Sequence, residues 1–174
     1  MVAAGLTIQE LAPAAVLARI PEIAAIWPEA SRNRVQDILP RHSERDGFRF
    51  LGALDESRLL AGFVYGYCGE AGQWWRDRVA AELGPAGTRR WLPPGHFELT
   101  ELHVRPEGRR RGIGGALHDA VLDGLAAPTS VLSTQTDNEP ALRLYERRGW
   151  QVIVPELDFG SGRPFVVMGK DLGV

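Results

Sequence analysis

The stretch VRPEGRRRGIGGAL, residues 104–117, is the most informative part of the sequence about the fold of this chain. An apolar strand pattern precedes it and a helical pattern follows it, so its glycines lie where a strand gives way to a helix. The first turn of a helix leaves backbone N–H groups unpaired, and the helix dipole adds partial positive charge there. Glycines lack a Cβ and let an anion approach the backbone closely. The stretch is therefore typical of a turn that binds phosphate or pyrophosphate.

Two familiar phosphate-binding turns do not fit this stretch. A P-loop requires a lysine and a hydroxyl residue directly after its last glycine, and neither follows here. A Rossmann turn requires a third glycine where this chain has Leu117. The pattern R/Q-x-x-G-x-G/A is met by Arg109, Gly112 and Gly114. A solvated basic helix start, with glycines that serve close packing, is the alternative for this stretch taken alone.

The composition is that of an ordinary globular domain. The 174 residues are 44% hydrophobic and carry a formal net charge of −2, whereas a nucleic-acid-binding domain is usually basic overall. The single cysteine, Cys68, excludes an intrachain disulfide and a cysteine metal cluster. His42, His96 and His118 lack metal-ligand spacing and are expected at surface or packing positions. No apolar run reaches ~18 residues and no signal-peptide pattern is present, so a cytoplasmic protein without a metal is expected.

Periodicity and turn residues predict a mixed α/β chain. The expected elements are a strand at 6–11, helices at 14–27 and 31–39, strands at 48–54, 59–67 and 97–104, a helix at 112–125, a strand at 129–135, a helix at 138–148, and strands at 151–157 and 165–170. Ser31 is expected to cap the second helix and Pro40 to end it, while Gly149 fits a helix C-terminal cap. Residues 69–95 are expected to form an insertion or long loop between the third and fourth strands, with a helix over 74–83.

A second motif lies after the turn. The segment TDNEPALRLYERRGW, residues 136–150, meets the pattern N-x-x-A-x-x-L-Y-x-x-x-G-[FW] through Asn138, Ala141, Leu144, Tyr145, Gly149 and Trp150. The strand FELTELHV and the glycine-rich turn precede this segment. The strand VLSTQ lies between the helix that follows the turn and this segment. With these pieces in this order, the chain resembles the GNAT superfamily of acetyl-CoA-dependent N-acetyltransferases over nearly its whole length.

The resemblance implies an architecture for the chain. Residues 1–174 would form a single α/β domain with a mixed, mostly antiparallel central sheet flanked by helices. The fourth and fifth strands, 97–104 and 129–135, would be splayed apart. Members of this family often pair through their C-terminal strands, so a homodimer is possible.

The resemblance also implies acetyl-CoA as co-substrate and assigns residues to it. Backbone N–H groups of 110–115 would hold the pyrophosphate, and Arg109 would shape the loop. The pantetheine arm would pair with the backbone of 102–104, where an edge amide would polarise the acetyl carbonyl. The residues assigned to the cofactor are Leu102, His103, Val104, Arg109, Arg110, Arg111, Gly112, Ile113, Gly114, Gly115, Asn138 and Tyr145.

Two residues are assigned to proton transfer. Glu98 lies six residues before Val104, where base-using members that resemble this chain keep a glutamate, and it is the expected general base. The alternatives are a Glu98 paired with an arginine of the 69–95 segment, or Glu101 as the base. Tyr145 is expected to give a proton to the leaving thiolate, and a purely core aromatic is its alternative. Glu101 and His103 lie on the face opposite Glu98 if the strand is regular, whereas a bulge would bring His103 to the other face.

The acceptor amine is not identified by the sequence. A small amine or antibiotic-like compound is slightly favoured over a peptide N-terminus or lysine. Trp74, Trp75 and Trp91 could form walls for the amine or anchor their segment in the core. The acidic residues that could attract a cationic acceptor are Glu70, Asp77, Glu82, Glu156 and Asp158. A CoA-binding sensor without turnover and a nucleic-acid-binding module that uses residues 109–111 are the competing classes.

Overall fold

The computed structural model describes residues 5–173. The described chain forms two compact units, of which the first comprises residues 5–67 and 100–125 and the second residues 68–99 and 126–173. One strand, β4 (Phe97–Val104), runs from the second unit into the first. Each unit is described by itself below.

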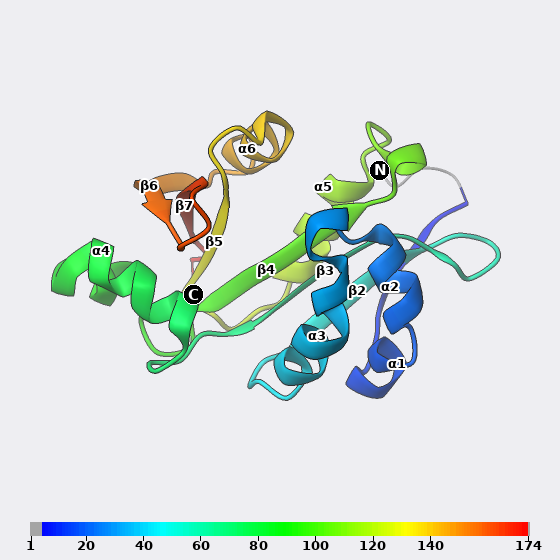
Figure 1. Ribbon diagram of the computed structural model, residues 1–174, viewed down its shortest axis with the longest axis horizontal. Helices are drawn as coiled ribbons and strands as arrows, with labels where there is room; N and C mark the ends of the chain where they lie inside the picture. The colour runs from blue at the N-terminus through cyan, green and yellow to red at the C-terminus, as the bar shows by residue number, and fades with distance from the viewer. Residues whose placement is uncertain (1–4, 174) are drawn as a thin grey trace. The chain divides into compact units, whose positions relative to one another are not determined.

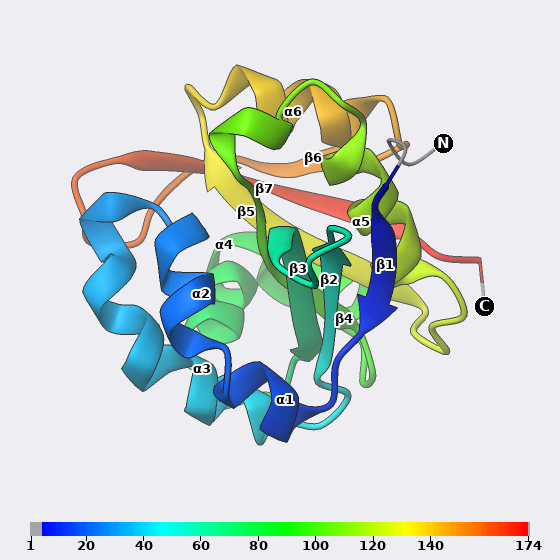
Figure 2. The same cartoon turned by 90° about the vertical axis from the view of Figure 1, so that its right-hand side faces the viewer.

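The first unit is a set of antiparallel strands with helices on both faces. Its strands are β1 (Thr7–Glu10), β2 (Arg49–Leu54), β3 (Leu60–Cys68) and the second half of β4, in that order across the sheet. Its helices are α1 (Pro13–Leu17), α2 (Ile20–Ile26), the 3-10 helix η1 (Glu29–Arg34), α3 (Val35–Ser43), the 3-10 helix η2 (Pro106–Gly108) and α5 (Ile113–Leu122). Figures 1 and 2 show α1, α2 and α3 on one face of these strands and α5 on the other.

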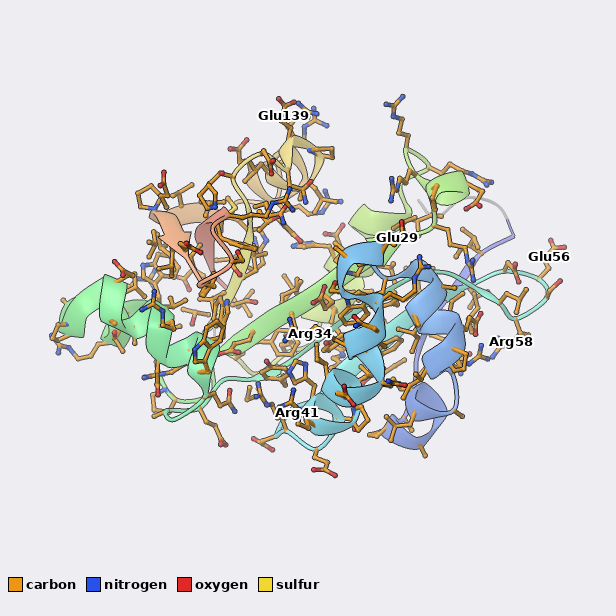
Figure 3. The ribbon with its side chains drawn as sticks, viewed as in Figure 1. Glu29, Arg34, Arg41, Glu56, Arg58 and Glu139 are labelled. Carbon is orange, nitrogen blue, oxygen red and sulfur yellow. The ribbon has the colours of Figure 1, made fainter. Side chains whose placement is uncertain are left out.

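Strand alternation explains both faces of this sheet. Phe50 lies opposite Tyr65 in the β2–β3 ladder, and both pack in one buried cluster with side chains of α1, α2 and α3. Leu51 and Ala53 point to the other face, on which α5 packs against β2. The turn between β2 and β3 carries Glu56 and Arg58 outward at its tip (Figure 3).

Two helix predictions are wrong in detail. The single helix expected over 14–27 is two helices, because Pro21 has no N–H to continue α1 and instead occupies the first turn of α2. The helix expected over 31–39 is η1 followed by α3. Ser31 makes no capping contact, and Pro40 lies inside α3, which continues to Ser43.

The second unit holds β5 (Thr129–Gln135), β7 (Pro164–Asp171) and β6 (Gln151–Asp158), in that order, with the start of β4 beside β5. The pairs β5–β7 and β7–β6 are antiparallel. Figure 2 shows α4 (Trp74–Trp91) and α6 (Glu139–Glu146) on different sides of these strands, and in Figure 3 Glu139 points away from them.

The helix expected at 74–83 extends to Trp91. Gly84 has a φ of 66°, so α4 bends there before Pro85 and then continues. Its buried residue, Val79, forms one cluster with Val131 of β5, Val154 of β6 and Val167 of β7.

Two of the three tryptophans of this segment are anchors. Trp75 Nε1 donates to Ser133 Oγ at 3.0 Å. The ring of Trp91 lies so close to Gly169 that a Cβ there would meet it at 2.5 Å. Trp74 is different, because it is 62% exposed and touches only the ring of Phe159 among the aromatic contacts of the described residues.

The predicted fold class is confirmed. The sheet is mixed, because the β4–β5 pair is parallel and the described ladders β1–β2, β2–β3, β5–β7 and β6–β7 are antiparallel. The parallel ladder joins only Phe97 to Ser130 and Glu98 to Val131. So short a ladder suits the expected splay, which stays a prediction. Across residues 5–173, the helices are too short or too polar to cross a membrane.

Candidate cofactor and catalytic site

The glycine-rich turn lies in the first unit, and it stands between a strand and a helix, as the sequence predicts. After β4 the chain passes through η2, and α5 begins at Ile113. Gly112 is the residue before the helix and adopts the left-handed conformation, with a φ of 79°. No side chain caps the first turn of α5. The amides of this turn therefore remain available to an anion.

Arg110 is the unusual residue of the turn. Its φ is 61°, a conformation that costs a residue with a side chain on the order of 1 kcal/mol or more. Strain of this kind is found where surrounding structure holds a functional backbone in place. Arg109 Nε lies 3.4 Å from the carbonyl oxygen of Val104, a contact that fits its assignment as the residue that shapes the loop.

The turn is held against β3 by contacts that the sequence does not reveal. Arg105 donates from its backbone N–H to Ala61 at 2.9 Å and from Nε to the Leu60 carbonyl at 2.6 Å. A Cβ on Gly62 would lie 2.8 Å from the His103 carbonyl oxygen, so β3 and β4 approach each other through a glycine. The paired strand signals of the hairpin and of β4 were present, but nothing in the sequence marked this close approach.

Glu101 and His103 form a pair on the face that α1, α2 and α3 cover. Glu101 Oε2 lies 2.6 Å from His103 Nε2, and both side chains are half-buried. The His103 ring packs against both Trp27 and Phe63, with centroid distances of 5.6 and 5.5 Å. Burial, and then the nearby Glu101 charge, raise the pKa of Tyr65 well above its ordinary value, so its hydroxyl keeps its proton.

His42 shares a 3.0 Å hydrogen bond with the Tyr65 hydroxyl through Nδ1. Burial, with the charges of Arg45 and Arg41, lowers the pKa of His42 to about 4. The ring is therefore neutral near pH 7. Arg45 itself lies over the ring of Tyr67, 4.4 Å from its centroid.

Glu98 belongs to the second unit and is buried, with 4% exposure. Its Oε1 lies 3.4 Å from Nε2 of His96, which is 1% exposed. His96 Nδ1 lies 2.9 Å from the Pro93 carbonyl oxygen. The sequence placed His96 among surface or packing residues, and nothing in its spacing marked it as a partner of Glu98.

Asn138 and Tyr145 also belong to the second unit. Asn138 is the N-cap of α6, accepting from the Ala141 amide at 3.4 Å and donating to Thr134 Oγ1 at 3.3 Å. Tyr145 is buried on the same helix, with its ring 5.7 Å from that of Trp150. The helix that the N-x-x-A-x-x-L-Y pattern predicts is therefore present, and it carries both residues. Within residues 5–173, no group of three or more His, Cys, Asp or Glu could hold a metal ion.

Comparison with known proteins identifies the family. The model of the acetyltransferase (GNAT) family matches residues 15–150, and the chain belongs to that family. It is similar to the GCN5-like protein acetyltransferase of Mycobacterium tuberculosis, with 39% identity over 121 residues, which are 65% of this chain and 59% of that protein. The chain thus spans less than two thirds of this relative.

Solved structures agree on the fold. Ard1 from Thermoplasma volcanium superposes with a TM-score of 0.67 at 19% identity, covering 96% of this chain and 97% of that one. A phosphinothricin acetyltransferase from Sinorhizobium meliloti, solved in complex with acetyl-CoA, superposes with a TM-score of 0.66 at 17% identity, covering 97% and 89%. These likenesses show the fold, and membership of the acetyltransferase (GNAT) family rests on the family model.

Proposed function

We propose that this protein transfers the acetyl group of acetyl-CoA directly to a primary amine. The observation that carries the proposal is the start of α5, where Gly112 leaves the first-turn amides without a side-chain cap. A pyrophosphate is the anion that suits such a turn. Backbone N–H groups of 110–115 would hold it, and Arg109, Arg110 and Arg111 would add charge-assisted contacts.

Residues 102–104 and Asn138 would hold the arm of the cofactor. Acetyl-CoA supplies an acetyl thioester, whose carbonyl needs a hydrogen-bond donor as the amine attacks. The amide of Leu102 or Val104 would be that donor. Asn138 already donates from Nδ2 to Thr134, so its amide is oriented before any ligand binds.

Proton transfer is assigned to Glu98 and Tyr145. The amine must lose a proton as it attacks, and Glu98 would accept it. The thiolate must gain one, and the Tyr145 hydroxyl would give it. Glu101 is the second candidate for the base, since it is half-buried and paired with His103 in the first unit.

The acceptor is a small amine or a protein amine. A small amine or antibiotic-like compound is the first choice from the sequence. The name of the Mycobacterium tuberculosis relative supports a protein lysine or N-terminus as the second. Of the acidic residues named above, Asp77 is the weakest candidate for attracting a cationic acceptor, because its carboxylate is already paired with Arg76 at 3.2 Å. A cytoplasmic location and a homodimer remain predictions.

An acceptor panel tests this function. Purified protein is mixed with acetyl-CoA and with small amines, aminoglycosides, lysine peptides or free peptide N-termini, and the free thiol is measured. We expect thiol release with at least one amine, and an acetylated acceptor of 42 Da higher mass, roughly the mass of one acetyl group replacing a proton. Stabilisation by acetyl-CoA without any thiol release across the panel would favour a sensor instead. Salt-sensitive DNA binding with no effect of acetyl-CoA on melting would favour the nucleic-acid module.

A further inference from the structure

Glu98 and His96 form a buried pair at the start of β4. Both side chains are almost completely enclosed, and the atoms that face each other are Glu98 Oε1 and His96 Nε2, 3.4 Å apart. The backbone around the pair is fixed. The carbonyl of His96 accepts from the Gly69 amide at 3.1 Å, and that of Phe97 accepts from Ser130 Oγ at 3.0 Å.

The hydrogen bonds of His96 restrict where its protons lie. The carbonyl of Pro93 can only accept, so the 2.9 Å contact requires that Nδ1 carries a proton. A neutral ring then has a lone pair on Nε2, directed at a carboxylate oxygen of Glu98. Two acceptors face each other unless one proton lies between them. One proton placed between Nε2 and Oε1 would join the two groups by a hydrogen bond.

Gly69 shows how closely the chain surrounds that position. A Cβ on Gly69 would lie 2.2 Å from both Glu98 Oε1 and His96 Nε2. Any side chain there would push the carboxylate and the imidazole apart. A glycine at this position is what allows the two groups to meet under the backbone.

We propose that His96 is a positioning residue for Glu98, and that it shares the proton which Glu98 takes from the acceptor amine. This inference rests on the proposed acetyl transfer. His96 would orient the carboxylate through Nε2 while its Nδ1–H is tied to Pro93. This arrangement resembles other bases that a second buried group orients.

The proton balance of the step closes. As the amine nitrogen forms its bond to the acetyl carbon, its N–H bond breaks and that proton passes to Glu98, where Nε2 of His96 shares it. The C–S bond breaks and the thiolate takes the Tyr145 proton. Solvent then removes the proton from the pair and returns one to Tyr145, so no oxidant, reductant or further reactant is needed.

The variant His96→Asn separates positioning from simple packing. The asparagine amide is placed to donate to Pro93, as Nδ1 does, but it cannot reach Glu98. We expect a kcat lower by about 10- to 100-fold, with the KM for acetyl-CoA within twofold of wild type. In a Glu98→Gln background, His96→Asn should cause no further loss, since the two groups act as a unit. Unchanged kcat in His96→Asn, or the same loss in both backgrounds, overturns the proposal.

A matched control is His118→Asn. His118 is also buried and hydrogen-bonded to an acidic neighbour, Asp119 at 2.8 Å, but on α5. Any change that it causes should be the same factor with and without Glu98→Gln. Gly69→Ala is a second route to the same end, because it should lower kcat by separating the pair while the melting temperature shows that the protein still folds.

A measurement without turnover separates this inference from the proposed function. In ¹⁵N spectra of the histidine rings, His96 should show a protonated Nδ1 in both wild type and Glu98→Gln. An unprotonated Nδ1 overturns the shared-proton arrangement even if the enzyme is active. Absence of acetyl transfer to every amine, with a protonated Nδ1, overturns the proposed function and with it the role of His96 in transfer.

Discussion

The guanidinium of Arg49 lies 2.6 Å from the carbonyl oxygen of Asp123, the C-cap residue that follows α5. The same Nη1 also donates to the carbonyl of Val121 at 3.0 Å. The last carbonyls of a helix have no partner within the helix, and a cation there also interacts favourably with the helix dipole. A side chain of β2 thus closes the C-terminal end of the helix whose N-terminal end is the proposed pyrophosphate turn.

Replacement of Arg49 should loosen that end. In Arg49→Met these two hydrogen bonds and the 3.1 Å ion pair of Nε with Glu10 are lost while most of the aliphatic packing remains, so we expect the free energy of unfolding to fall by about 1–2 kcal/mol. Urea denaturation measures this change. Arg49→Lys, which keeps the charge but not the forked donors, should lose less. Equal stability of Arg49→Met and wild type would contradict the assigned contact.

Gly112→Ala should damage acetyl-CoA binding more than it damages the fold. A φ of 79° is unfavourable for alanine, and we expect a stability loss of about 1 kcal/mol. Because the backbone of this turn is the proposed pyrophosphate site, acetyl-CoA affinity should fall by about tenfold or more. Calorimetry or acetyl-CoA-dependent melting measures this fall.

Gly124→Ala is the matched control for that experiment. Gly124 has a φ of 70° and open space where a Cβ would stand, but it lies beyond the other end of α5. Its stability loss should be similar and its acetyl-CoA affinity close to that of wild type. Equal affinity of the two variants would remove the turn as the binding site.

Strands were predicted better than helices, for physical reasons. Residues 97–104 and 129–135 agree with β4 and β5 at both ends, because apolar alternation and flanking turn residues mark a strand locally. Prolines misled the helix predictions. Pro21 lies in the first turn of a new helix, α2, although the apolar pattern continues across it. Pro40, in contrast, is tolerated inside helix α3. Helix α4 bends at Gly84 and then continues to Trp91. This continuation depends on packing against Val131 and its neighbours, which the local sequence pattern does not reveal.

The features of the candidate site also differ in how well the local sequence predicted them. Local chemistry predicted the turn, since a strand, three glycines and a helix are adjacent in sequence. Local sequence could not identify His96 as the partner of Glu98. The contact between them depends on the Pro93 carbonyl, which fixes the His96 ring, and on Gly69, whose backbone passes close to both side chains. Likewise, Glu101 and His103 were expected on one face, but their 2.6 Å contact depends on side-chain conformation.

His42 should make stability depend on pH. Its pKa is about 4 in the folded protein and near 6.5 when unfolded, so the unfolded state binds more protons between these values. Stability is therefore lost as the pH falls through this window. Because the ring is only partly buried, we expect this loss to be about 1 kcal/mol between pH 7.5 and pH 5.

His42→Gln tests that dependence. Glutamine does not titrate and can still hydrogen-bond to the Tyr65 hydroxyl. Urea unfolding at pH 7.5 and pH 5 should show a smaller loss of stability in the variant than in wild type, by about 1 kcal/mol. The same loss in both proteins would mean that His42 titrates normally.

Asp158 should stabilise the turn between β6 and β7. Its Oδ1 accepts from the amides of Gly160, Ser161 and Gly162 at 2.8, 3.0 and 3.1 Å. Asp158→Ala leaves these amides to water, and we expect a stability loss of about 1 kcal/mol in thermal or urea unfolding. If the main effect is instead a higher KM for a cationic acceptor with unchanged stability, Asp158 attracts the acceptor.

Tyr145→Phe should lower kcat and leave binding intact. The substitution removes only the hydroxyl and keeps the ring beside Trp150, so the melting temperature should change little. If this hydroxyl supplies the proton to the thiolate, kcat should fall by about 100-fold, with the KM for acetyl-CoA within twofold of wild type. Steady-state kinetics on whichever amine the acceptor panel selects gives both values. A kcat equal to that of wild type would make Tyr145 a packing residue of α6 and would require another donor for the leaving thiolate.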